Sequence, residues 1–172
     1  ISLSGIACFQ SIKVAGDSMD ESIRHYFRKE YNVAIGIKTA EQVKIQVGAV
    51  MAELENPPAP MAVKGKELLR GLPVTRTVDH REIAGVLEKS MSAIELGIIQ
   101  TLETCPPELA ADIYGSGVYV TGGNALLRGL QDRLQRRLKL PVNIDETPLL
   151  SVSRGIATVL REPGKYKSVL MH

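Results

Sequence analysis

The chain has 172 residues, of which 44% are hydrophobic and 23% charged, and its formal net charge is +2. This length suits one domain or two small ones with a core of useful size. So small a net charge gives no broad field that would attract nucleic acid or an anionic membrane. No apolar run approaches the roughly 18–20 residues of a membrane span, and no signal peptide is visible. We therefore expect a globular protein with no nucleic-acid partner and no transmembrane segment.

The chain contains two cysteines, Cys8 and Cys105, which do not have the spacing of metal ligands. So few cysteines favour free thiols in a reducing compartment, and a disulfide between them is the less favoured alternative. The chain begins without methionine, inside the β-like run ISLSGIACF. We therefore expect it to be a piece of a longer protein.

The first fifteen residues alternate between apolar and polar positions. Residues 1–9 and 10–15 predict a two-stranded hairpin, and the pattern breaks at Gly16 and Asp17.

Two capping boxes predict the next two helices. Ser18, followed by Glu21, begins a helix that runs to about residue 30, and Thr39, followed by Gln42, begins one that runs to about residue 47. The proline-rich stretch 53–60 predicts a loop.

The remaining chain predicts paired strands and then alternating helices and strands. Two β-like runs after the loop could pair, and Asp79 caps a long helix that follows them. The alternation in the last third implies parallel strands there, so the chain belongs to the α/β class with a mixed sheet. The expected elements are strands 61–65, 71–78, 117–121 and 141–144, and helices 80–104, 106–116, 125–138 and 151–160.

No residue pattern indicates a catalytic centre. His25, His80 and His172 have no serine or cysteine at the spacing of a nucleophile, and we expect them to be exposed. The helix 125–138 has a basic face, which favours a solvated surface over a polyanion site because no aromatic residues accompany it. Its members are Arg128, Arg133, Arg136, Arg137 and Lys139.

Three stretches could contact a ligand. The TGG sequence at 121–123 ends a predicted strand, and backbone without Cβ atoms could touch a flat ring or a phosphate, with a helix N-terminus following. A tight turn is the alternative. In TAEQVK, Glu41 could accept hydrogen bonds from a ribose diol with Lys44 nearby, and a surface ion pair is the alternative. The AGDSMD turn at 15–20 could receive an anion or simply begin a helix.

These stretches, in this order, resemble a known family. IKVAGDSMDESI, IGIKTAEQVKIQVG, KGKELLRGLPVTRTV, TLETCPPELAADIYGSGVYVTGGNALLRGL and PVNIDETPLLSVSRGIATVL are similar to the C-terminal half of the bacterial rod-shape-determining actin homologues, the MreB family. The resemblance covers nearly all of the chain except the proline loop and the last dozen residues. The CPPELAADI and GLP segments separate this family from actin, chaperones and sugar kinases, which share only the fold and the glycine pair.

The resemblance implies a fold and a division of the chain. The fold is the second large domain of an actin-like (ribonuclease H-like) ATPase, a mixed sheet flanked by helices, with a smaller inserted α+β subdomain. Residues 1–32 and 79–162 would form the large subdomain, 33–78 the smaller outer subdomain, and 163–172 a flexible tail.

The resemblance also implies a site for ATP or ADP with Mg²⁺. Its TAE-x-x-K helix would line the sugar and base, with Glu41 on the ribose, and its glycine turn would pass over the base and α-phosphate. Asn124 stands where the family usually has a third glycine. The implied contact residues are Gly16, Asp17, Glu41, Gln42, Val43, Lys44, Gly122, Gly123, Asn124 and Ala125.

The role implied by the resemblance is that of a cytoskeletal ATPase. The family polymerises into ATP-dependent filaments at the cytoplasmic face of the inner membrane and guides cell-wall elongation, which sets rod shape. Its implied partners are further copies of itself, a membrane-anchored adaptor and the elongation complex. The family's phosphate loops and catalytic glutamate have no counterpart in this chain, so we expect weak ATP binding, if any, and no hydrolysis. The alternatives are another actin-fold ATPase, such as a chaperone or kinase, and a non-catalytic binding module.

Overall fold

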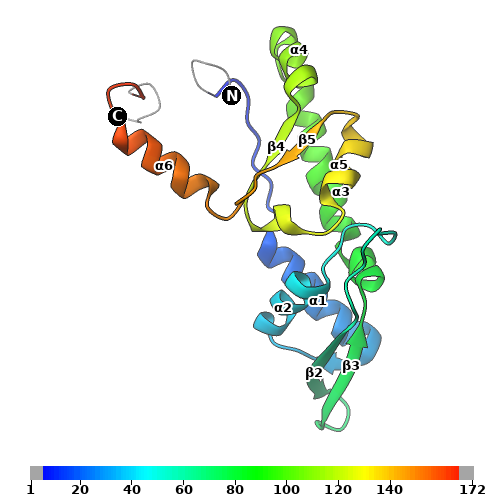
Figure 1. Cartoon of the computed structure of the whole chain (residues 1–172). Coiled ribbons are helices and arrows are strands. Elements are labelled where there is room, and N and C mark those ends of the chain that lie inside the picture. The colour runs from blue at the N-terminus through cyan, green and yellow to red at the C-terminus, as the bar shows by residue number, and fades with distance from the viewer. Residues whose placement is uncertain (1–5, 167–172) are drawn as a thin grey trace.

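The computed structural model describes residues 6–166 and shows an α/β chain with a helix projecting at its C-terminal end (Figure 1). Its helices are α1 (Gly16–Tyr31), α2 (Ile37–Val47), α3 (His80–Glu103), α4 (Pro107–Ser116), the 3₁₀ turn η1 (Gly123–Leu126), α5 (Leu130–Leu138) and α6 (Ser151–Arg161). Its strands are β1 (Val33–Ala34), β2 (Met61–Glu67), β3 (Pro73–Val78), β4 (Val118–Val120) and β5 (Val142–Ile144).

The strands form two small sheets. The first has the order β1-β2-β3 with antiparallel neighbours, and Met61 pairs with Val78. This pairing confirms the expected partnership of the two runs after the proline loop. In the second sheet β4 and β5 are parallel, with Val118 opposite Val142, which confirms the parallel pairing expected in the last third.

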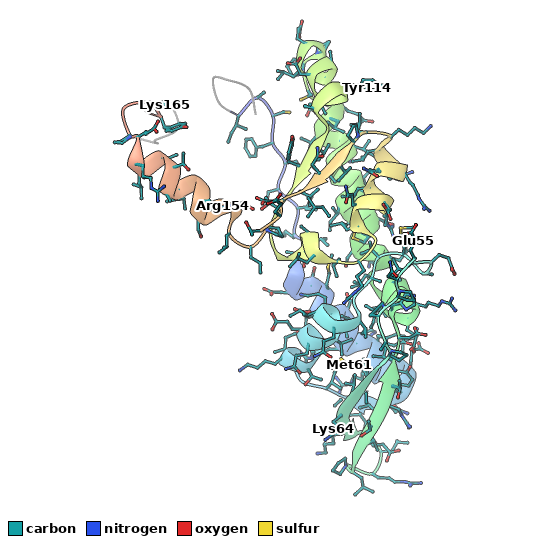
Figure 2. All side chains as sticks on the ribbon, viewed as in Figure 1. Glu55, Met61, Lys64, Tyr114, Arg154 and Lys165 are labelled. Atoms are coloured by element: carbon teal, nitrogen blue, oxygen red, sulfur yellow. The ribbon has the colours of Figure 1, made fainter. Side chains whose placement is uncertain are left out.

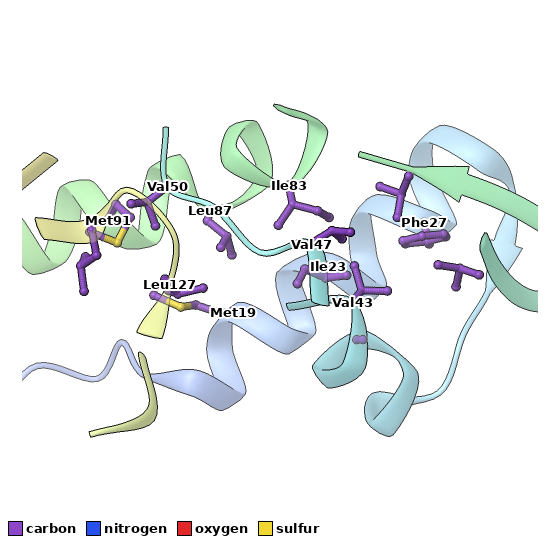
Figure 3. Packing of buried hydrophobic residues seen from close by; sticks show 14 of the residues in the cluster. Met19, Ile23, Phe27, Val43, Val47, Val50, Ile83, Leu87, Met91 and Leu127 are labelled. Atoms are coloured by element: carbon purple, nitrogen blue, oxygen red, sulfur yellow. The ribbon is translucent and has the colours of Figure 1, made fainter. Parts of the chain in front are cut away.

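The core lies between α1, α2, α3 and the first sheet (Figure 3). Met19, Ile23 and Phe27 recur at intervals of four on α1, so they form one apolar stripe, and all three are fully buried. They meet Val43 and Val47 from α2, and Ile83 and Leu87 from α3. Helix α1 packs against α2, β1 and α3. This packing associates α1 with the elements expected in the smaller subdomain, and the division of the chain into subdomains stays a prediction.

The expected hairpin at the N-terminus is wrong in its described part. Residues 6–15 contain no strand and instead run along α3, where the side chain of Gln10 donates a hydrogen bond to the side chain of Gln100. Residues 1–9 of the expected first strand lie partly outside the described residues. The alternating side chains of this segment lie against the surface of α3 and not beside a second strand.

The expected helix 125–138 is divided in two. After η1, Leu127 and Arg128 leave the helix, and Arg128 forms an isolated parallel bridge with Ala49. Gly129 then adopts φ +78°, a left-handed conformation that favours glycine, and α5 begins at Leu130. The long-range backbone pairing therefore interrupts a helix that the leucine spacing predicted.

The predicted Asp79 cap of α3 is confirmed, whereas the predicted capping boxes Ser18–Glu21 and Thr39–Gln42 are wrong. Asp79 accepts from the Glu82 N–H at 3.0 Å, and Glu82 accepts from the Asp79 N–H at the same distance. Helix α1 begins two residues before Ser18, whose hydroxyl accepts from the backbone N–H of Ala15. Helix α2 likewise begins at Ile37, ahead of the expected cap.

Two further expectations concern the ends and surface of the chain. Each helix within residues 6–166 is either too short or too polar to span a lipid bilayer. Most of the expected flexible tail, residues 167–172, lies outside the described residues.

His25 is exposed as expected, but His80 is buried, and its Nε2 lies 3.0 Å from the backbone oxygen of Ala52. The expectation that His80 is exposed was therefore wrong, because the chain after α2 folds over it.

Candidate nucleotide-binding surface

The three stretches singled out in the sequence meet at the beginning of α1. The Nζ of Lys44 on α2 donates to the backbone oxygen of Gly16 at 3.2 Å. The side-chain oxygen of Asn124 lies 3.6 Å from the point where a Cβ on Gly16 would stand. Figure 1 shows the start of α1 between α2 and η1. Segments more than a hundred residues apart in sequence therefore share one surface.

Gly16 has little room for a side chain. A Cβ there would lie 3.2 Å from the Nζ of Lys44, which is tighter than most real Cβ contacts. The helix that begins at Gly16 has unpaired backbone N–H groups in its first turn and the positive end of its dipole there. The Lys44 ammonium also lies beside this helix end, where the Asp20 carboxylate compensates its charge. The helix end suits an anionic group, whereas the exposed Asp17 carboxylate in the same turn has a like charge and opposes one.

A buried ion pair fixes the position of Lys44. Its Nζ lies 2.8 Å and 2.9 Å from the two carboxylate oxygens of Asp20, and the side chains are 11% and 6% exposed. Asp20 was not among the contact residues expected from the sequence. An acidic residue next to the buried stripe of α1 was the available signal, because buried charges are nearly always paired.

The glycine turn leaves its backbone open. Gly122 has φ +87°, and no atom lies within 4 Å of the point where its Cβ would stand. Its N–H donates to the backbone oxygen of Pro148 at 2.9 Å, which holds the turn in place. Gly123 is more confined, since its Cβ would lie 3.3 Å from Leu149. A flat ring could therefore approach the backbone at Gly122 without meeting a side chain.

The four residues expected on α2 do not all reach the surface. Glu41 and Gln42 are exposed, and Glu41 lies one turn before Lys44. Val43 is fully buried and belongs to the core, so its side chain positions the helix and cannot touch a nucleotide. Ala125, which lies in η1, is also buried.

The basic face around α5 is largely engaged in internal bonds. Arg133 donates to Glu88 at 2.6 Å, to Glu95 at 2.5 Å and to the backbone oxygen of Val50 at 2.9 Å. The bond from Arg133 lowers the pKa of the Glu88 carboxyl and keeps it ionised. Arg128 donates to backbone at the end of α2. The expected solvated face is therefore wrong for Arg133, which is mostly buried in ion pairs, and these contacts also argue against a polyanion site.

A cavity of about 780 Å³ lies beside this cluster, away from the surface at Gly16. It is lined by both carboxylates and arginines, among them Glu88, Glu95 and Arg136. Within residues 6–166, no three histidine, cysteine or acidic side chains are grouped to hold a metal ion. The cavity therefore has a lining of mixed charge, whereas the surface at Gly16 brings together the stretches singled out in the sequence.

Comparison with known proteins identifies the family. The model of the MreB/Mbl protein family matches residues 1–168. The cell shape-determining protein Mbl of Bacillus subtilis is 40% identical over 160 residues, which cover 93% of this chain and 47% of that protein. The cell shape-determining protein MreB of Escherichia coli is 38% identical over 160 residues, which cover 90% of this chain and 44% of that protein. The chain thus spans about half the length of these relatives.

Solved structures agree with the sequence comparison. MreB5 of Spiroplasma citri bound to AMPPNP matches with a TM-score of 0.89 and 38% identity, over 94% of this chain and 48% of that one. The MamK double helical filament matches with a TM-score of 0.73 at 21% identity, over 88% of this chain and 46% of that one, which shows the shared actin-like fold. From the family match over nearly its whole length, the chain belongs to the MreB/Mbl family of actin-like proteins.

Proposed function

We propose that this chain forms the adenosine-side wall of an ATP cleft in a cell shape-determining, actin-like filament protein. The observation that carries the proposal is the meeting of Gly16, Lys44 and Asn124 at one surface, beside the open backbone of Gly122. An anion-attracting helix end next to an uncovered peptide surface suits a nucleotide, which has both phosphates and a flat base.

Similar proteins support a nucleotide as the ligand. MreB5 of Spiroplasma citri has been crystallised with AMPPNP and with ADP, and the second of these structures matches with a TM-score of 0.88 at 36% identity. We infer that ATP or ADP binds here, together with Mg²⁺ carried on the phosphates.

Each part of the surface has a separate role in the proposal. Glu41 accepts hydrogen bonds from the ribose diol, and Gln42 lies beside it. The backbone from Gly122 to Ala125 lies against the base and α-phosphate. On the phosphate side are Gly16, Asp17 and Lys44, whose ammonium is held in place by Asp20.

We infer that the chain by itself does not hydrolyse ATP. Phosphoryl transfer needs positioned phosphates, a metal ion and an oriented water. The proposed contacts hold the nucleotide from one side and include no residue that would orient the water. The ATPase activity expected of the longer protein would depend on residues beyond this chain.

The cellular role follows from the relatives. Mbl of Bacillus subtilis and MreB of Escherichia coli are cell shape-determining proteins, and MamK forms a double helical filament. We propose that the protein self-associates into filaments at the cytoplasmic face of the inner membrane. There it would engage a membrane-anchored adaptor and guide the cell-wall elongation complex. A chaperone or sugar kinase of the same fold is not favoured, because the family match is to MreB/Mbl.

The site can be tested on the chain itself by nuclear magnetic resonance. A titration with ATP·Mg²⁺ up to millimolar concentration should shift the backbone amide signals of Gly16, Gly122, Gly123 and Asn124. The Glu41→Gln substitution should weaken this response about tenfold or more, because a hydrogen bond to a charged group is lost. The matched control is Glu55→Gln, since Glu55 is an exposed carboxylate in the proline loop (Figure 2).

Two outcomes would contradict the proposal. Shifts confined to α5 around Arg136 would indicate simple anion binding at the basic face. An unchanged response in Glu41→Gln would remove the ribose contact. Calorimetry addresses the second part of the proposal, because a micromolar dissociation constant for ATP·Mg²⁺ would show that the missing phosphate loops are not needed.

A further inference from the structure

The two cysteines of the chain lie in contact in the fold. The Sγ atoms of Cys8 and Cys105 are 3.0 Å apart, although the residues are 97 positions apart in sequence. Cys8 belongs to the segment 6–15 before α1, and Cys105 to the turn between α3 and α4. Both are free thiols and both are partly exposed, so a small molecule in solution can reach them.

The contact is part of a regular alignment between the N-terminal segment and α3. The Nε2 of Gln10 donates to the side-chain oxygen of Gln100 at 3.0 Å. Two residues further on, Ile12 lies against the helix, with its Cγ2 3.1 Å from the point where a Cβ on Gly97 would stand. Gln10 and Ile12, two residues apart, thus both face α3.

Cys8 continues this alternation in the other direction. Cys8 lies two residues before Gln10, and its partner Cys105 lies eight residues after Gly97, in the turn that follows α3. The segment and helix therefore run in opposite directions in a fixed register. The two thiols are in contact because this register between the segment and α3 brings them together.

The local geometry permits a covalent bond. A disulfide has an S–S length of about 2.05 Å, so the sulfurs need to approach by about 1 Å. Neither cysteine lies in a helix or strand, so the backbone at both sites can adjust. In the reduced protein the hydrogen bond with Cys8 raises the pKa of the Cys105 thiol.

We propose that Cys8 and Cys105 form an oxidation site, at which a small-molecule disulfide converts the two thiols into an intramolecular disulfide that fastens the segment 6–15 to α3. The Cys8 thiolate attacks one sulfur of the oxidant and releases one thiol, leaving a mixed disulfide on Cys8. The Cys105 sulfur, after losing its proton, attacks the Cys8 sulfur and releases the second thiol. The protein loses two hydrogens, and one oxidant molecule is reduced to two thiols.

The crosslink restrains the segment that leads into the candidate nucleotide-binding surface. The segment 6–15 continues directly into Gly16, which contacts Lys44. A bond at Cys8 fixes the far end of this short segment on α3. It also joins residues 97 apart, so it restricts the unfolded chain strongly. The proposal is independent of nucleotide binding and can hold even where the site assignment fails.

Mass spectrometry tests the chemistry directly. The reduced chain is incubated with oxidised glutathione, treated with N-ethylmaleimide, and weighed intact. The expected product is a monomer that lacks two hydrogens and bears neither glutathione nor maleimide. The single variants Cys8→Ser and Cys105→Ser serve as matched controls, and each should retain glutathione on its one remaining cysteine.

Two outcomes would overturn the oxidation site: glutathione on both cysteines of the unsubstituted chain, or a disulfide-linked dimer on a non-reducing gel. A second measurement tests the fastening. The oxidised chain should have a melting temperature higher by about 5–15 °C than the same chain reduced. Its amides at residues 6–15 should also exchange hydrogen more slowly. An intramolecular disulfide with unchanged melting and exchange would show that the segment is not fastened.

Discussion

Helices α1 and α6 are both amphipathic, but only α1 has its apolar side chains covered. Phe27 of α1 is 0% exposed, whereas Ile156 and Leu160 of α6 are 56% and 71% exposed. Helix α6 projects from the rest of the chain beyond Arg154, and its side chains extend without a neighbouring element (Figure 2). An amphipathic pattern therefore predicts a helix in both cases, while burial depends on the surface that meets its apolar face.

The same contrast separates two regions of the molecule. Residues 16–91 contain most of the buried cluster, drawn from α1, α2, α3 and the first sheet. The region after α3 has a sheet of two short strands, and Tyr119 in its β4 strand is 73% exposed. Stability should thus reside mainly in the first region, and substitutions in the two regions should differ accordingly.

The largest expected effect is at Phe27. The Phe27→Ala substitution should lower the free energy of unfolding by about 3–5 kcal/mol, because it empties a fully buried site. The measurement is urea denaturation followed by circular dichroism. The matched change Ile156→Ala on α6 should alter the free energy of unfolding by no more than about 0.5 kcal/mol. Equal losses in the two variants would show that α6 is packed in solution.

The buried ion pair should have the next largest effect. Lys44→Met leaves the Asp20 carboxylate buried without its partner and should destabilise the chain by about 3 kcal/mol, near the low end of the range for such pairs because Lys44 keeps some exposure. Urea denaturation again gives the free energy. The control is Lys64→Met on the exposed face of β2, which should have little effect (Figure 2).

A double substitution sharpens this prediction. Asp20→Leu combined with Lys44→Met removes both charges together, so it should recover most of the stability lost in the single variant. A double variant as unstable as Lys44→Met alone would mean that lost packing, and not an unpaired charge, causes the destabilisation.

The smallest effect should be a local one at the start of α6. Hydrogen bonds from the Ser151 hydroxyl, the Thr147 N–H and the Arg154 guanidinium lower the pKa of the Asp145 carboxyl. A lowered pKa in the folded state means that Asp145 stabilises this helix start above its ordinary pKa of about 3.9. The stabilisation is lost as the pH falls below that value toward the folded-state pKa.

Hydrogen exchange across α6 between pH 6 and pH 3 checks this dependence. Once the intrinsic effect of pH on exchange is removed, protection at residues 151–161 should fall with acidification in the unsubstituted chain. In Asp145→Asn it should be low throughout and nearly independent of pH. The neighbouring change Glu146→Gln should behave like the unsubstituted chain, since Glu146 is exposed. A pH response that persists in Asp145→Asn would assign it to another group.

The candidate site was predictable in its segments but not in its contacts. Sequence indicated the stretches around Gly16, Lys44 and Gly122, because glycines and a charged helix face are visible without a structure. It could not indicate that the Lys44 ammonium binds Asp20, or that Val43 is turned into the core. Those outcomes depend on how α1 and α2 pack against each other, which is a property of two helices and not of either one.

Elements whose signals are local could be predicted from the sequence alone: the Asp79 cap of α3, the proline that begins α4, and the pairing runs of β2 and β3. The sequence could not show where a contact with a residue far away along the chain overrides the local pattern, because that contact exists only in the folded protein. The tertiary structure breaks the expected helix at Arg128 through pairing with Ala49, and it lays residues 6–15 on α3. The physical reason is that caps and turns depend on interactions within a few residues. Burial, ion pairing and the contact between two thiols depend on surfaces that only folding brings together.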